Sequence, residues 1–88
     1  MSDLVFPTIH MNGTSKADLL NQVCDALSAL RKAQEALQCA SPNGRDYYVQ
    51  EAGALTKALD QHCARLRKLN EVKNELEAIA EHIAEVER

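Results

Sequence analysis

Two apolar runs with helical spacing, divided by a helix-breaking tetrapeptide, constrain the fold of this chain more than any other feature. The first run covers about 15–40, and its main stripe consists of Leu20, Val23, Leu27, Leu30 and Leu37. A second stripe repeats every seven residues and consists of Leu19, Ala26, Ala33 and Ala40. The break is Ser41-Pro42-Asn43-Gly44, in which proline lacks an amide hydrogen and Asn-Gly tolerates left-handed backbone angles. The pattern predicts two helices joined by a turn.

The second run, over about 50–87, changes phase part-way along. Its stripe consists of Leu55, Leu59, His62, Leu66, Leu69, Val72, Leu76, Ile79, Ile83 and Val86. Two successive steps of three around Leu69 form a stammer, which either overwinds a coiled coil or directs the stripe towards a different partner. We expect the change of partner. At 1.5 Å per residue the helices are about 38 Å and about 55 Å long, so we expect about ten C-terminal residues to overhang an antiparallel hairpin.

An N-terminal arm, residues 1–14, carries apolar side chains suited to cover this overhang. They are Leu4, Val5, Phe6 and Ile9. They can pack on their own chain or, by domain swapping, on a neighbouring copy.

The size of the chain limits its core. With 88 residues and three aromatic side chains, it forms one small domain whose core depends on Leu, Ala, Val and Ile. Such a core supplies only about 3–5 kcal/mol, and the first helix has a broader apolar face than a two-stranded coiled coil needs. We therefore expect an all-α, antiparallel two-helix hairpin with an N-terminal arm that assembles into a homo-oligomeric helical bundle.

Charge and cysteine patterns argue against several classes of function. The net charge is −3 and residues 71–88 hold six glutamates, so we expect no specific DNA binding. No stretch approaches the roughly 20 apolar residues of a membrane span, and residues 1–12 lack signal-peptide features. We expect no membrane partner and a cytoplasmic location in a bacterial host cell. Three cysteines without Cys-x-x-Cys spacing predict buried, reduced thiols.

The sequence offers no pair of groups suited to catalysis, and we expect a non-catalytic protein without cofactor or metal. His62 and Cys63 diverge by about 100° on a helix, so they cannot form a dyad. The residues three before His62 and His82 are Leu59 and Ile79, not the glutamates of a di-metal bundle site. On the leucine stripe, His62 is more often a hydrogen-bonded core histidine than a ligand contact, and in an oligomer it could meet its symmetry mates.

Residues with chemical potential gather in two segments outside the helices. In the first, Asn12-Gly13-Thr14-Ser15 leads into a helix whose free amides attract anions, with His10 and Lys16 nearby. A phosphate fits this pattern. An ordinary cap, in which Gly13 turns the chain and Ser15 accepts an amide, explains the same residues.

The central segment combines a planar cation with two aromatic rings. Arg45 offers a five-donor fork for phosphate, and Tyr47 or Tyr48 offers a face on which a base stacks for about 1–3 kcal/mol. Alternatively, Asp46 pairs with Arg45 and one tyrosine fills the end of the hairpin. Because adjacent residues point apart, the other tyrosine then faces solvent, a partner or a ligand.

The two motifs, Ile-His-x-Asn-Gly-Thr-Ser at 9–15 and Pro-Asn-Gly-Arg-Asp-Tyr-Tyr at 42–48, resemble those of small, mostly uncharacterised phage, prophage and mobile-element proteins. This resemblance covers most of the chain and implies an origin, not a mechanism. In size and hairpin plan the chain also resembles phage counter-defence sponges, oligomers that sequester cyclic nucleotide or ADP-ribose-type immune signals between subunits. No sponge motif matches residue by residue, so this likeness is one of plan.

Two functions follow as hypotheses. The first is a non-catalytic counter-defence sponge that holds a nucleotide immune signal between copies of the chain. Its candidate ligand-binding residues are His10, Asn12, Gly13, Thr14, Ser15, Lys16, Asn43, Arg45, Tyr47 and Tyr48. The alternative is a small helical adaptor or inhibitor whose arm and acidic C-terminal helix bind a host or phage protein.

Overall fold

Helix α1 (Lys16–Cys39) begins and ends where local sequence signals predict. The Oγ of Ser15 accepts a hydrogen bond from the backbone N–H of Asp18 at 3.1 Å, which satisfies one of the free amides of the first turn. The helix ends at Cys39, with Ala40 as its C-cap, two residues before Pro42. The cap interpretation of Ser15 and the predicted stop are both confirmed.

Helix α2 (Ala54–Glu85) begins four residues later than the apolar pattern predicts. Gly53 precedes it with φ 89°, a left-handed conformation that an α-helix cannot include. The connection between the helices is therefore 14 residues long, and it contains a short 3₁₀-helix η1 (Gly44–Asp46). The Oδ1 of Asn43 caps η1 by accepting the N–H of Arg45 at 3.0 Å.

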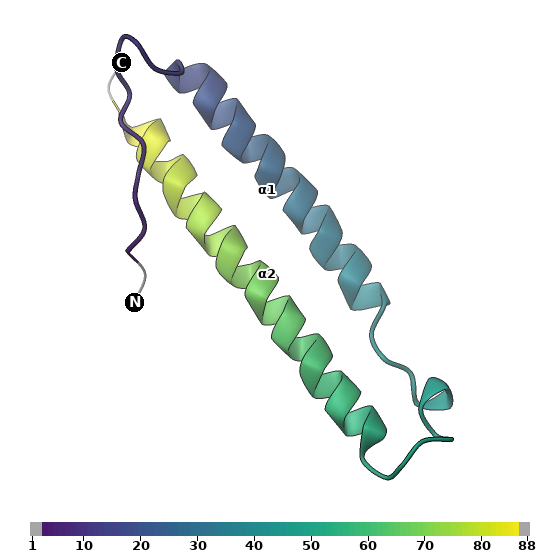
Figure 1. Cartoon of the computed structure of the whole chain (residues 1–88). Coiled ribbons are helices and arrows are strands. Elements are labelled where there is room, and N and C mark those ends of the chain that lie inside the picture. Colours follow the sequence, from purple (N-terminus) through teal and green to yellow (C-terminus); the bar gives the residue numbers. More distant parts are fainter. Residues whose placement is uncertain (1–2, 87–88) are drawn as a thin grey trace.

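The computed structural model describes residues 3–86, in which the two long helices run antiparallel and no strand is present (Figure 1). The expected all-helical hairpin is confirmed. The molecule measures 61 × 26 × 18 Å, and its Cα radius of gyration is 18.6 Å, against about 12 Å for a compact domain of this length. One chain thus forms a rod with a high ratio of surface to volume.

The helices pair in a register that differs from the expected one. The Nζ of Lys16 donates a hydrogen bond to the backbone oxygen of Val86 at 2.6 Å, and Arg31 forms an ion pair with Glu77 at 3.7 Å. The start of α1 therefore lies level with the end of α2, and the extra turns of α2 extend past α1 at the loop end. The predicted C-terminal overhang was wrong, because the 14-residue connection runs beside the first turns of α2 instead of turning tightly.

The N-terminal arm, drawn in purple in Figure 1, lies along the C-terminal half of α2 in the same chain. The ring of Phe6 stacks on the ring of His82, with centroids 4.7 Å apart and an interplanar angle of 24°. Ile83 is completely buried. The arm contacts α2 at His82, which lies beside the apolar stripe, so coverage of the stripe itself stays a prediction. Residues 1–2 of the arm and 87–88 of the predicted helix fall outside the described part of the chain.

Few side chains of the hairpin are buried. Among residues 3–86 these are Leu27 of α1 and His62 and Ile83 of α2. The remaining leucines between the helices are half-buried, except Leu59, which is exposed, as is Val72 of the same stripe. All three cysteines are exposed, so the prediction of buried thiols was wrong. Cys24 and Cys63 directly follow Val23 and His62, and a step of one residue turns a side chain about 100° away from the stripe.

Candidate functional site

The two segments with candidate ligand-binding residues lie at opposite ends of the rod. The first, residues 10–16, precedes α1, and the second, residues 43–48, follows it (Figure 1). The 24 residues of α1 separate the two segments by about 36 Å. One copy of the chain therefore does not bring the ten predicted residues into a single site.

The N-terminal segment is a tight turn in which the side chains of Ser15 and Lys16 are already engaged. The N–H of Gly13 donates to the carbonyl oxygen of His10 at 3.1 Å. A Cβ atom at Gly13 would lie 2.8 Å from Nε2 of His10, so a larger residue there would have to displace the exposed His10 ring. The Oγ of Ser15 caps α1, and the ammonium group of Lys16 is hydrogen-bonded to Val86. Asn12 and Thr14 are exposed beside them.

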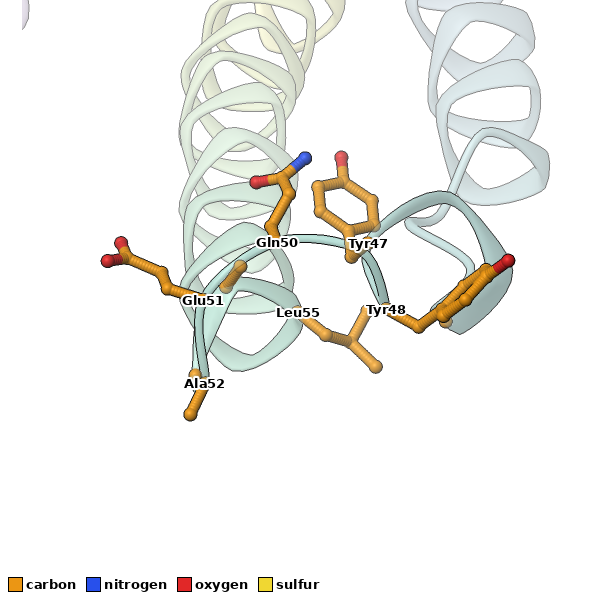
Figure 2. A pocket seen from close by; sticks show the side chains of 9 residues that line it. Tyr47, Tyr48, Gln50, Glu51, Ala52 and Leu55 are labelled. Carbon is orange, nitrogen blue, oxygen red and sulfur yellow. The ribbon is translucent and has the colours of Figure 1, made fainter.

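The central segment forms the tip of the hairpin and separates the roles of its two tyrosines. Figure 2 shows Tyr47 pointing into the space between the helices and Tyr48 pointing away from it. Tyr47 is half-buried, whereas 78% of the surface of Tyr48 is exposed. The prediction that one tyrosine packs and the other faces outward is confirmed, and Tyr48 is the outward one.

An open hollow of about 470 Å³ lies at this tip (Figure 2). Both tyrosines line it, together with Gln50, Glu51 and Leu55. A second hollow of about 210 Å³ shares Tyr47, Gln50 and Glu51 with the first and adds Lys57. The sequence analysis missed Gln50 and Glu51 because it placed 50–53 inside the second helix, and it assigned Leu55 only to the apolar stripe. Gly53, a favoured residue at helix N-caps, was the signal that could have corrected that boundary.

The charges around the tip are unequal. Glu51 is the only ionisable carboxylate that lines the larger hollow, and no lysine or arginine lines it. Arg45 is exposed nearby in η1, and within residues 3–86 the one ion pair joins Arg31 to Glu77. The alternative in which Asp46 pairs with Arg45 is therefore not realised. The guanidinium group of Arg45 remains available to a ligand or partner.

His62 stands out among the buried residues. It is 5% exposed, and its Nε2 has no hydrogen-bond partner in the described chain. It is therefore a core histidine, but without the hydrogen bond at Nε2 that such residues usually make. The described residues hold no group of three His, Cys, Asp or Glu side chains arranged to bind a metal. Neither α1 nor α2 is long and apolar enough to cross a membrane.

Comparisons with family models, with curated proteins and with solved structures each found no match to this chain.

Proposed function

We propose that this protein is a non-catalytic, homo-oligomeric sponge that sequesters a nucleotide-type immune signal at the tips of its hairpins. The observation that carries the proposal is the tip itself, where the exposed ring of Tyr48 borders an open hollow and Arg45, three residues earlier, has a guanidinium group without an ion-pair partner in residues 3–86.

The chemistry of the tip suits a ligand with a base and a phosphate. A hollow of about 470 Å³ is within the roughly 300–1,000 Å³ of small-molecule sites. The base would stack on Tyr48 beside Leu55, since this lining carries no cation to hold a phosphate. The phosphate would bind outside the hollow, at Arg45 and at Lys57 of the smaller hollow.

An open hollow on one chain leaves much of such a ligand in water, which is why the proposal includes a second copy. Small-molecule sites bury about 70–90% of a ligand. The exposed side chains of Asn12 and Thr14, which lie at the opposite end of their own chain, could close the site from another copy.

The test is calorimetric titration with cyclic dinucleotides, cyclic mononucleotides and ADP-ribose-type compounds. We expect one of them to bind, Tyr48→Ala and Arg45→Ala each to weaken binding at least ten-fold, and Tyr48→Phe to retain it. The matched control is Arg67→Ala, which removes an exposed arginine from α2 away from the tip. Absence of binding across the panel, or equal effects of Arg45→Ala and Arg67→Ala, would contradict the proposal.

A second candidate function is a helical adaptor or inhibitor of a host or phage protein. The exposed apolar pair Tyr48 and Val49 favours it, because neighbouring exposed apolar side chains are common at protein interfaces. Truncation of α2 is unsuitable as a test, since the C-terminal turns of α2 hold the arm. Instead, Val49→Asp should abolish capture of one specific protein from host lysate while leaving nucleotide binding intact, whereas a sponge captures no specific protein.

A further inference from the structure

The outer face of α1 has no partner among residues 3–86. We define this face by Gln22, Ala26, Ala29, Ala33 and Ala36, all of which are exposed. The leucine stripe of α1 faces α2, so the broad apolar surface expected from the sequence is only partly used inside the hairpin. Small side chains on an exposed helix face allow a second helix to approach closely.

The accessible surface of the chain indicates how much of it a partner would cover. One copy exposes 6694 Å², about 1,600 Å² more than the roughly 5,100 Å² of a compact 9.7 kDa monomer. A standard interface covers about 800 Å² on each partner. The excess exposed surface of one chain is therefore larger than the area that one partner covers in a standard dimer interface.

Charges beside the outer face select the partner and its direction. Asp25 and Lys32 are both exposed and lie on the same flank of this face. Asp25 comes four residues before Ala29, and Lys32 comes three residues after it. If a two-fold axis passes beside Ala29, antiparallel pairing places Asp25 of each copy level with Lys32 of the other. In a parallel two-fold pair this flank of one copy would face the opposite flank of the other, so Asp25 and Lys32 of the two copies would not meet. The face is thus electrostatically complementary to itself in one direction only.

We infer that two copies of this chain pair antiparallel through the outer faces of α1, with Ala29 at the two-fold axis. This inference rests on the proposed homo-oligomer and assigns its interface. Ser15 lies 14 residues before Ala29 and Asn43 lies 14 after it, so the pairing brings the N-terminal segment of one copy level with the tip of the other. The dimer then has two equivalent composite sites, each with Asn12–Lys16 from one copy and Asn43–Tyr48 from its partner.

Disulfide cross-linking tests this geometry. In a background with Cys24, Cys39 and Cys63 replaced by serine, single cysteines are introduced at exposed positions of α1 and oxidised. Ala29→Cys should yield a disulfide-linked dimer, because residues at the axis face their own copies within the 4.4–6.8 Å Cα separation that a disulfide needs. Ser28→Cys, which is turned about 100° around the helix, should stay monomeric on a non-reducing gel.

Ala36→Cys distinguishes the two directions of pairing. In the antiparallel pair, its two copies lie about 20 Å apart along the helices and cannot cross-link, whereas in a parallel pair they would. Cross-linking of Ala36→Cys, equal cross-linking of Ala29→Cys and Ser28→Cys, or none with Ala29→Cys would overturn the inference. Circular dichroism of each variant checks that the hairpin is folded.

Charge reversal provides an independent test. Asp25→Lys should raise the dissociation constant of the dimer about ten-fold in low salt, and adding Lys32→Asp should restore it, as measured by sedimentation. Failure of the double variant to recover would contradict the pairing. A dimer that cross-links at Ala29 but binds no nucleotide would refute the sponge and leave the interface standing. A nucleotide-binding oligomer that does not cross-link at Ala29 would refute the interface alone.

Discussion

Replacement of His62 by leucine should stabilise the hairpin. His62 is 5% exposed on the stripe between the helices, and its Nε2 has no hydrogen-bond partner in the described chain. Leaving a buried polar atom unsatisfied costs about 1–3 kcal/mol, and leucine fills a similar volume without polar atoms. His62→Leu should therefore raise the free energy of unfolding by about 1–3 kcal/mol.

The assay is urea denaturation of wild type and variant at one protein concentration, since self-association makes the stability depend on concentration. In a parallel thermal melt, the melting temperature should rise by about 4–8 °C for each kcal/mol gained in the free energy of unfolding. Arg67→Leu is the matched control, because it places a leucine on the exposed side of the same helix at similar helix propensity. A loss of stability in His62→Leu, with Arg67→Leu unchanged, would refute the reasoning and show that Nε2 is hydrogen-bonded in the folded protein.

Three further substitutions test other parts of the fold. Gly53→Ala forces a residue with a side chain into φ 89° and should lower the free energy of unfolding by about 1–2 kcal/mol in urea denaturation. The control is Gly44→Ala, which should be neutral because its Cβ would lie 3.6 Å from its nearest neighbour. Phe6→Ala should release the arm, cost about 1 kcal/mol and speed proteolysis there, whereas Val5→Ala, at a position 84% exposed, should change neither. Ser15→Ala removes the α1 cap and should lower the free energy of unfolding by about 0.5–2 kcal/mol in a thermal melt. Ser15→Asp should keep both the cap and the stability.

The parts of the fold that depend on local signals were predictable from sequence. The cap at Ser15, the stop before Pro42 and the two apolar stripes each act within a few residues, and the structure contains all of them. The phase slip around Leu69 did not indicate that α2 leaves α1, because Lys16 at the start of α1 is hydrogen-bonded to Val86 at the end of α2.

The register of the helices and the shape of the tip depend on non-local contacts and were not predictable. Their determinants are the left-handed Gly53 and the path of the 14-residue connection, which decide where α2 begins relative to α1. For the same reason, the sequence indicated that Tyr47 and Tyr48 diverge but not which one points outward. The hollow beside them depends on residues that the periodicity assigned to a helix.

The arm has a consequence for how the protein is made. Its docking surface, around His82 and Ile83, is among the last parts of the described chain to leave the ribosome. At roughly 5–20 residues per second, about 4–15 s pass between synthesis of the arm and synthesis of this surface. During that interval Phe6 cannot stack on His82 of its own chain, so the arm stays undocked until the end of α2 has been made.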